Sequence, residues 1–577
     1  MKTSILFIVL LAFIGLSVNA QNWAWERVSN GTNNVHEVYT FGTTTDFAGN
    51  VYITGKFLSS NLKLGNLTLY NHDTLTSLMS DMFLAKYDPN GNVIWAVSAG
   101  GDDNDCGNAV TTDAQGNVII TGRFRSKYLA FGTDTLWNAR HWMFDCFIVK
   151  YDSNGNYLWA KRAGGGDDEN GLAVSTDHVG NVYVGGTFKS NTINFGNYTY
   201  ANADSGYDDI FLVKMAPNGT VLRLNHYGNY GAEEVQSMAI DANNNIYITG
   251  LFNSQTLAFG NITLTLGANS MTDMFIAKMD TNANFLWAFN AGGGNMNAGM
   301  GVCIDNSGNA YVTGYFRGPS ITFGSTVLTN TVNGATDVFV VKYKYNGIVL
   351  WAKSAGGGSH DSGFGCATDG TNVYVTGFSY SPTFTFGNDT LQNGGDADIF
   401  VLEYDQSGNP VFAKSARGIY ADNGMCIAVD HNSNIYIAGQ FFSQTLIFDN
   451  DTLTGPLVYK MFLAKLSPIT TDIQATEIIP QIGIIYPNPN NGTFTLNYHP
   501  AAIGIPNNAP IKLELKDVFG RTVFTYPIHE SATLMPNSEI PITVPLNNGI
   551  YFWELIAADE FSHPNPILAN GKLVLMK

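Results

Sequence analysis

A phrase of seven residues that ends in glycine returns seven times along this chain of 577 residues. The first two copies are Gly49-Asn-Val-Tyr-Ile-Thr-Gly55 and Gly116-Asn-Val-Ile-Ile-Thr-Gly122, and the shared Asn recurs every 62 to 67 residues. A fixed period of this length is typical of repeat architectures, in which each unit buries its apolar faces against its neighbours. The fold must therefore be built from seven similar units.

Each period holds three further phrases. One is Asp81-Met-Phe-Leu-Ala-Lys-Tyr87 and its relatives, one is centred on a Trp such as Trp95, and one ends in an Asp such as Asp46. The segments are rich in Val, Ile, Tyr, Phe and Thr and are separated by Asn, Asp and Gly, a pattern typical of short strands and tight turns. We expect an all-β fold in which seven four-stranded antiparallel blades form a β-propeller.

The two ends of the array are incomplete in complementary ways. The chain opens with a lone copy of the Trp phrase, Trp23-Ala-Trp25-Glu-Arg-Val28, and the seventh unit stops after Met461-Phe-Leu-Ala-Lys465 without one. We predict that the N-terminal strand becomes the outer strand of the last blade. This pairing would close the ring and remove an exposed sheet edge.

These phrases resemble the bacterial β-propeller repeats known as SBBP repeats, whose units carry a Gly-Asn-x-Tyr-Val-Thr-Gly strand followed by Asp-x-Phe-x-x-Lys. The resemblance covers roughly residues 22 to 467 and implies a propeller but no particular reaction. The chain departs from the pattern at Arg223 and Phe412 in place of Trp, at Glu403 in place of Lys, and at Lys460 in place of Asp. Individual contacts between blades are expected to differ there.

Composition and the N-terminus predict an exported protein. Lys2, an apolar run from Ile5 to Ile14 and a small-residue site ending at Ala20 read as a signal peptide over residues 1–20, followed by the propeller over 21–467. No later apolar run is long enough to span a bilayer. With 47 acidic and 29 basic residues the net charge is −18, which disfavours nucleic acid and anionic membranes as partners.

The chain has five cysteines, one more than an even set of disulfides would use. They occupy unmatched positions of different repeats, namely Cys106, Cys146, Cys303, Cys366 and Cys426. A disulfide scaffold or a zinc site would be expected to show framework spacing. We therefore interpret them as buried thiols.

After a linker at residues 468–480, residues 481–577 carry new strand-like runs between Pro, Asn and Gly, which predict a small antiparallel β-sandwich of the Ig-like kind. This segment resembles the type A sorting domain of the type IX secretion system of Bacteroidetes. The residues that carry the resemblance are Tyr486, Pro487, Asn488, Pro489, Gly492, Asp517, Gly520, Gly549, Tyr551, Gly571, Lys572 and Lys577. The resemblance implies passage through the type IX machinery, removal of the domain by a sortase-like peptidase, and surface attachment or release. An ordinary sandwich appendage is the alternative.

One repeat position is acidic more often than packing requires. Eight residues before each strand-ending aspartate, the first unit has Val38, and the other units have Asp105, Glu169, Glu233, Asn297, Asp361 and Asp422. The position falls at the start of the strand nearest the axis, so we expect a ring at one mouth of the channel. Carboxylate and amide oxygens suit calcium. The alternative is that the loops are solvated and their acids bond backbone amides.

One loop of the second repeat is aromatic. Trp137, Arg140 and Trp142 lie within Trp137-Asn-Ala-Arg-His-Trp142. Two Trp side chains with an Arg between them are suited to stacking on sugar rings or to holding a protein partner. Packing against a neighbouring blade is the alternative.

No enzyme signature is found in the sequence: it lacks a Gly-x-Ser-x-Gly elbow, a His-Glu-x-x-His motif, a phosphate loop and a dinucleotide fingerprint. We expect a non-catalytic binding or adhesion module for glycans or proteins, at the cell surface or secreted. A scaffold without a ligand is the first alternative. The second is a glycan-processing enzyme that uses carboxylates such as Glu169 and Glu233 at the channel mouth.

Overall fold

The computed structural model describes residues 21–29, 37–73, 79–204, 206–468, 483–486, 492–498, 511–517, 521–528, 538–557 and 567–575. The chain divides into two compact units, Met1–Ile469 and Thr470–Lys577. All regular structure in the described residues is β, as the sequence predicts. The expected signal peptide and most of the expected linker lie outside the described residues.

The repeat region, residues 21–468, is built from seven repeat units, which we number 1 to 7 in chain order. Their first strands are β2 (Val38–Thr45), β8 (Asp105–Thr112), β14 (Glu169–Thr176), β20 (Glu233–Ile240), β26 (Asn295–Ile304), β32 (Asp361–Thr368) and β38 (Asp422–Val429). Their second strands are β3 (Val51–Phe57), β9 (Val118–Phe124), β15 (Val182–Phe188), β21 (Ile246–Phe252), β27 (Ala310–Phe316), β33 (Val373–Ser379) and β39 (Ile435–Phe441). First and second strands pair antiparallel in every unit.

Two more antiparallel strands complete each unit. The third strands are β6 (Asp81–Tyr87), β12 (Asp145–Tyr151), β18 (Asp209–Met215), β24 (Ser270–Met279), β30 (Asp337–Tyr343), β36 (Asp398–Tyr404) and β42 (Lys460–Pro468). The outer strands of units 1 to 6 are β7 (Val93–Ala99), β13 (Tyr157–Gly164), β19 (Val221–Tyr227), β25 (Phe285–Ala291), β31 (Val349–Gly357) and β37 (Pro410–Arg417). In unit 7 the outer strand is β1 (Gln21–Val28), which pairs with β42 from Gln21 opposite Pro468 to Val28 opposite Phe462.

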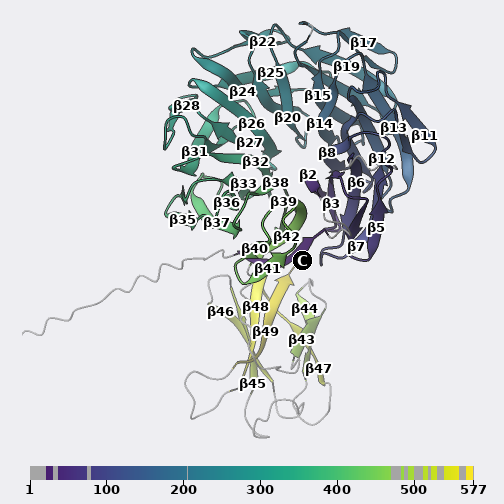
Figure 1. Ribbon diagram of the computed structural model, residues 1–577. Helices are drawn as coiled ribbons and strands as arrows, with labels where there is room; N and C mark the ends of the chain where they lie inside the picture. The colour runs from purple at the N-terminus through teal and green to yellow at the C-terminus, as the bar shows by residue number, and fades with distance from the viewer. Residues whose placement is uncertain are drawn as a thin grey trace, which may run out of the picture. The chain divides into compact units, whose positions relative to one another are not determined.

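The first strands lie innermost, and the other strands of each unit extend outward from them (Figure 1). Each first strand packs beside the first strand of the next unit, and β38 packs beside β2. The arrangement is propeller-like: the described strands form separate open sheets, and none of these sheets closes on itself.

Every unit also contains a short hairpin that the sequence reading did not anticipate. The hairpin lies between the second and third strands of its unit. From unit 1 to unit 7, the two strands of the hairpin are β4 (Asn61–Leu64) with β5 (Leu67–Tyr70), β10 (Tyr128–Phe131) with β11 (Asp134–Trp137), β16 (Thr192–Phe195) with β17 (Tyr198–Ala201), β22 (Thr256–Phe259) with β23 (Ile262–Thr265), β28 (Ser320–Phe323) with β29 (Thr326–Thr329), β34 (Thr383–Phe386) with β35 (Asp389–Gln392), and β40 (Thr445–Phe448) with β41 (Asp451–Thr454). Two side chains of the first hairpin strand, such as Leu257 and Phe259, are fully buried. The hairpin therefore adds apolar area to the core of its unit.

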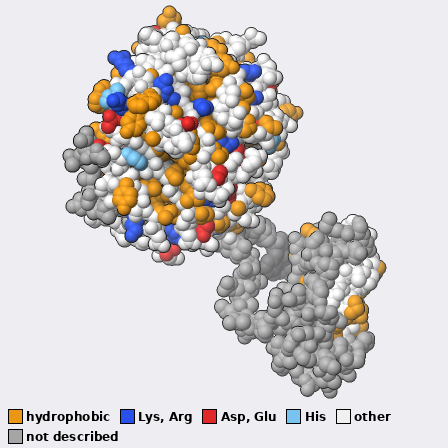
Figure 2. Space-filling model, turned by 90° about the vertical axis from the view of Figure 1, so that its right-hand side faces the viewer, with side chains coloured by type: hydrophobic (Ala, Val, Ile, Leu, Met, Phe, Trp, Pro, Cys, Tyr) orange, Lys and Arg blue, Asp and Glu red, His pale blue; other side chains and the backbone are white. Residues whose placement is uncertain are grey.

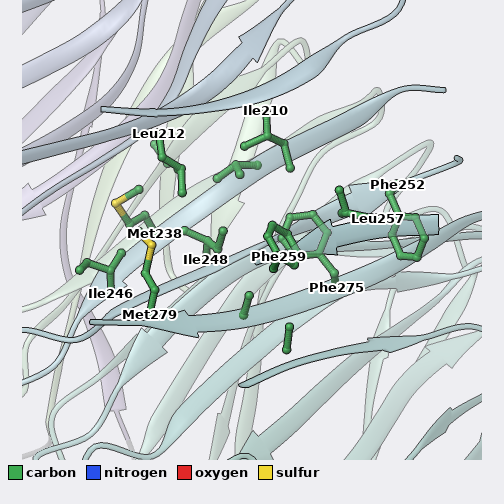
Figure 3. Packing of buried hydrophobic residues seen from close by; sticks show 14 of the residues in the cluster. Ile210, Leu212, Met238, Ile246, Ile248, Phe252, Leu257, Phe259, Phe275 and Met279 are labelled. Atoms are coloured by element: carbon green, nitrogen blue, oxygen red, sulfur yellow. The ribbon is translucent and has the colours of Figure 1, made fainter. Parts of the chain in front are cut away.

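The hydrophobic core is divided among the boundaries between neighbouring units. In the cluster of Figure 3, side chains from β18 of unit 3 meet side chains from β20, β21, β22 and β24 of unit 4. Second and third strands are buried on both faces, as in Val51–Phe57 and Asp81–Tyr87. This explains why their sequences are continuously apolar rather than alternating.

A repeated pair of hydrogen bonds ties five of the seven units to the next one. In unit 1, Lys86 Nζ and Trp95 Nε1 both donate to the carbonyl oxygen of Ser153, in the turn before the outer strand of unit 2, at 3.0 and 3.1 Å. The corresponding Lys and Trp of units 2 and 5 donate to Pro217 and Gln406 in the same way. The repeated Lys and Trp thus stabilise the stacking of units.

The second compact unit contains two antiparallel sheets. One has β43 (Gly483–Tyr486), β44 (Thr493–Tyr498) and β47 (Ser538–Thr543), and the other has β45 (Ile511–Lys516), β46 (Thr522–Ile528), β48 (Gly549–Ala557) and β49 (Ile567–Leu575). Both sheets contribute to one buried cluster that includes Phe494, Leu513 and Trp553. The described strands therefore form a small β-sandwich.

Candidate functional site

The predicted acidic ring is buried inside the units. The six side chains Asp105, Glu169, Glu233, Asn297, Asp361 and Asp422 are each 0% exposed. Asp105 accepts a hydrogen bond from Ser126 Oγ at 2.6 Å, and Asp422 accepts one from Ser443 Oγ at 2.8 Å. Both serines follow the second strand of the same unit, so these carboxyl groups are held within their own units.

Each ring residue also faces an acid of the preceding unit. Glu169 N donates to Phe144 O at 2.7 Å, which places Glu169 next to Asp145, the first residue of β12. Burial, with the nearby charge of Asp145 as a smaller cause, raises the pKa of Glu169 to about 8. One oxygen of each carboxyl group, Glu169 Oε1 and Asp145 Oδ1, has no hydrogen-bond partner among the described residues. The raised pKa favours the protonated form of Glu169, which can donate a hydrogen bond where the ionised form cannot.

The same arrangement recurs at six of the seven boundaries between units. The pairs are Asp81 with Asp105, Asp145 with Glu169, Asp209 with Glu233, Asp273 with Asn297, Asp337 with Asp361, and Asp398 with Asp422, each 24 residues apart. At the seventh boundary, Val38 and Lys460 replace both members, although Val38 N still donates to Tyr459 O at 3.0 Å. These pairs were not predicted; the constant spacing of 24 residues was the signal for them.

The six residues do not form one ring at the mouth of a channel, and calcium binding by them stays a prediction. No three His, Cys, Asp or Glu side chains in the described residues lie close enough together to hold a metal ion. The reason is geometric: the start of each first strand points its side chain into the boundary between two units instead of toward the axis. The six residues are therefore divided among separate pairs.

A different set of side chains lines the centre of the repeat region. A cavity of about 340 Å³ is lined by residues from the middle of all seven first strands. Each of these strands has a β-bulge, for example between Gly299 and Gly301 in β26, so that Met300 is left unpaired. A bulge re-aims the side chain of its extra residue. The seven bulged residues are Phe41, Asn108, Leu172, Gln236, Met300, Phe364 and Met425, and all of them line the cavity.

The sequence did not predict the residues that line this cavity, because the seven bulged residues are not of one type. The available signal was positional: five of the seven follow a glycine directly, as Met300 follows Gly299. Five of the seven are apolar, and two are amides. The cavity is therefore lined by uncharged residues, unlike the acidic mouth expected from the sequence.

The aromatic loop of unit 2 is at the surface. Trp137 is 59% exposed at the end of β11, and Trp142 is 65% exposed in the loop before β12. Trp137 lies 5.3 Å from the Tyr128 ring between centroids, and Trp142 stacks on His141 at 4.0 Å. Both rings are mainly exposed and contact aromatic residues of their own unit, which argues against the alternative that they pack on a neighbouring unit.

Polar contacts hold the backbone of this loop in place. Asn138 Nδ2 donates to Phe124 O and Met143 O at 3.2 and 2.9 Å, and Arg140 Nη1 donates to Gly166 O of unit 3 at 2.8 Å. Trp142 has a φ of 83°, which is rare for a bulky side chain. Such strain persists where the surroundings impose it and is concentrated at functional sites.

Some of the predicted sorting-motif residues can be placed in the second compact unit. Asp517 accepts hydrogen bonds from the backbone and side chain of Arg521, and Tyr551 OH donates to Asn547 O at 3.1 Å. Gly492 O accepts from Val544 N at 2.9 Å, and Gly549 begins β48. Tyr486, Gly571 and Lys572 lie in β43 and β49. Pro487, Asn488, Pro489, Gly520 and Lys577 lie outside the described residues.

Comparison with known proteins identifies the second compact unit. Residues 484–565 match the family described as secretion system C-terminal sorting domain. The sorting domain implies a secreted cargo protein that interacts with the type IX secretion machinery and is located at the cell surface or outside the cell. Within the described residues, no helix has the length and apolar character needed to cross a membrane.

The chain is also similar to other proteins over part of its length. An uncharacterized WD repeat-containing protein, L264 of Acanthamoeba polyphaga mimivirus, is 25% identical over 480 residues, which cover 69% of this chain and 35% of that protein. The regulatory protein FlaEY of Caulobacter vibrioides is 30% identical over 112 residues, or 19% of this chain and 12% of that protein. The chain thus spans about a third or less of these curated relatives. The Pan2 WD40 domain of Neurospora crassa has a TM-score of 0.36 at 8% identity, covering 75% of this chain and 90% of that domain.

Proposed function

We propose that this protein is a non-catalytic binding or adhesion module for glycans or proteins, presented at the cell surface or secreted by a member of the Bacteroidetes. Its repeats are of the SBBP type and form a seven-bladed propeller closed by the N-terminal strand. A sortase-like peptidase removes the sorting domain after export. The sorting domain and the exposed aromatic loop support this proposal.

Three contacts between the ends of the repeat region support closure. Strand β1 pairs with β42 along its length. Val38 N donates to Tyr459 O, and Thr45 Oγ1 donates to Val429 O at 3.1 Å. The last contact repeats the one by which Thr112 Oγ1 donates to Thr45 O at 3.1 Å, so unit 7 meets unit 1 as unit 1 meets unit 2.

The observation that carries the binding proposal is the pair of exposed Trp side chains in one strained, well-anchored loop. Trp137 and Trp142 offer large flat surfaces at low entropic cost, since Asn138 and Arg140 already fix the backbone between them. On the face shown in Figure 2, hydrophobic side chains lie among uncharged ones, with Lys, Arg, Asp and Glu side chains scattered between them. Exposed Trp side chains suit uncharged sugar rings or a protein partner.

The buried position of the carboxyl groups argues against a glycan-processing enzyme. Glu169 and Glu233 are 0% exposed and belong to different boundaries between units. A substrate cannot reach a buried carboxyl group, and glycoside cleavage needs two such groups on either side of one bond. A scaffold without a ligand remains the alternative, and the exposure of Trp137 and Trp142 favours binding over it.

A glycan array with the purified full chain tests the proposal, with and without calcium. We expect retention that falls about tenfold in Trp137→Ala and Trp142→Ala, as for an aromatic contact of 1 to 2 kcal/mol. Tyr230→Ala is the matched control, because Tyr230 is an aromatic residue with 78% exposure in another unit. Shortened glycans would instead show an enzyme. If the array is silent, capture of surface proteins by the wild type and not by the Trp variants would indicate a protein ligand, and no capture would indicate a scaffold.

A further inference from the structure

Two of the five thiols lie together at the boundary between units 5 and 6. Cys303 is on β26 and Cys366 is on β32, the first strands of neighbouring units. Both side chains pack against the same buried cluster, which includes Tyr311 and Val338. All five cysteines are free thiols in the structure. Cys106, Cys146 and Cys426 are buried, as expected, whereas Cys303 and Cys366 are only partly buried.

The local geometry places the two cysteines on closely packed neighbouring strands. Cys366 Sγ lies 3.5 Å from the carbonyl oxygen of Tyr311, and Tyr311 is the residue directly opposite Cys303 in the pairing of β26 with β27. The two strands also approach closely, since a Cβ atom at Gly301 would lie 3.0 Å from Cys366 N. Besides burial, the neighbouring Cys366 also raises the pKa of the Cys303 thiol, in agreement with this close approach.

The remaining three thiols have other neighbours. Cys106 Sγ lies 3.3 Å from Asn108 Oδ1, Cys146 Sγ lies 3.8 Å from Thr121 Oγ1, and Cys426 Sγ lies 3.6 Å from Ala438 O. They belong to units 2 and 7, away from the boundary between units 5 and 6. One pair and three single thiols account for the odd number of cysteines.

We propose that Cys303 and Cys366 form a disulfide bond in the exported protein, which covalently joins neighbouring repeat units. The two thiols lose two protons and two electrons as the S–S bond forms, and a disulfide-donor oxidoreductase of the exporting compartment accepts the electrons and becomes a dithiol. Disulfides form and persist in such oxidising compartments. The inference uses export, implied by the sorting domain, and is independent of the proposed binding role.

The environment of Cys303 indicates when the bond forms during folding. Burial raises the pKa of the Cys303 thiol well above its usual value, and the neighbouring Cys366 raises it further. The thiolate is the reactive species in thiol–disulfide exchange, so Cys303 should react slowly in the folded protein. We therefore expect the bond to form before the units finish packing. Once formed, it should resist reductants unless the protein is unfolded.

Differential alkylation of the exported protein tests the proposal. Protein recovered from the exterior of an exporting host is unfolded without reductant and treated with a first alkylating reagent, then reduced and treated with a second. We expect the second label only on Cys303 and Cys366, and a peptide pair joined through them before reduction. The first label on all five cysteines would overturn the proposal.

Two variants provide matched controls. In Cys366→Ser, Cys303 should react with the first alkylating reagent instead of the second. Cys426→Ser, which removes a single thiol, should leave the linked pair unchanged. Wild-type protein that has been unfolded, reduced and refolded should melt several degrees below the oxidised protein, while Cys366→Ser should show no such difference. Equal melting temperatures with an intact linked peptide would show that the bond forms without stabilising the fold.

Discussion

Trp25 Nε1 donates a hydrogen bond of 3.1 Å to the carbonyl oxygen of Pro89, and Lys465 Nζ donates to the same oxygen at 3.1 Å. Trp25 lies on β1 and Lys465 on β42, so this contact attaches both ends of the repeat region to unit 1. It has the same form as the contact of Lys86 and Trp95 with Ser153. The N-terminal strand thus supplies unit 7 with the Trp that the other units encode internally.

Removal of this indole donor should weaken the joint between the chain ends. We expect Trp25→Phe to lower the free energy of unfolding by about 1 kcal/mol, the usual value of one hydrogen bond. The control is Trp23→Phe on the same strand, because Trp23 Nε1 is buried without a partner among the described residues. Thermal denaturation of the full chain should show a lower melting temperature for Trp25→Phe only. Equal shifts in both variants would contradict a specific role for the Pro89 contact.

Arg223 and Phe412 stand where the repeat pattern has Trp. Restoring Trp at these two positions should have different effects on the stability of the protein. In unit 3, Arg223 stands opposite Lys214, which donates to Thr281 O at 3.3 Å, and a small cavity lies between Arg223 and Thr281. We expect Arg223→Trp to fill this space, donate to Thr281 O and stabilise the protein by about 1 kcal/mol. Denaturant unfolding measures the change.

The corresponding substitution to Trp in unit 6 should not stabilise the protein. Phe412 stands opposite Glu403, whose carboxylate accepts a hydrogen bond from Asn372 Nδ2. The third and outer strands of unit 7 come from opposite ends of the repeat region, so no hairpin turn between them offers a carbonyl. Phe412→Trp should therefore leave the free energy of unfolding unchanged or lower. A gain equal to that of Arg223→Trp would show that the turn carbonyl is not what the Trp requires.

The glycine that ends the repeated seven-residue phrase is required because two strands approach closely there. At Gly250, an added Cβ would lie 1.8 Å from the carbonyl oxygen of Glu234 on the neighbouring strand. We expect Gly250→Ala to destabilise the protein by about 3 kcal/mol, because the backbone would have to move. At Gly166 an added Cβ would meet nothing within 4 Å, so Gly166→Ala should change stability by less than about 0.5 kcal/mol. Melting temperatures of the two variants make the comparison.

The buried carboxyl pairs should make stability fall as pH rises. Burial, with the nearby charge of Asp209 as a smaller cause, raises the pKa of Glu233 from 4.5 to about 8. Between these two values the folded protein holds a proton that the unfolded chain has released, so stability decreases with pH across that range. Glu233→Gln is neutral at all pH values and should reduce the decrease. Asp389→Asn, at an exposed acid, should leave it unchanged.

Denaturant midpoints measured from pH 4.5 to pH 8.5 provide the test. The steepest loss should lie below pH 8, and Glu169→Gln should act as Glu233→Gln does, since burial also raises the pKa of Glu169 to about 8. A stability that is flat across this range would mean that the pairs are ionised or are neutralised by a bound cation. Addition of calcium, and then of chelator, at pH 8 distinguishes these two cases.

The sequence by itself determined the all-β class, the seven repeats and the position of most strands. These features depend on short local patterns, such as the turn residues around Gly116 and the apolar run of Asp81–Tyr87, which act within one unit. The partner of β1 also followed from counting, because unit 7 lacked one phrase. The hairpins were missed because their strands are only four residues long, too short to show a period.

Only the tertiary structure decided which side chains meet. The bulge at Met300 and its equivalents inserts one residue into each first strand, and a shift of one residue reverses the face to which every following side chain points. Side chains that start a first strand therefore turn into the boundary between units, while bulged residues line the channel. The pairing of Glu169 with Asp145 and of Cys366 with Cys303 depends on the packing of adjacent units, which no local pattern within one unit specifies.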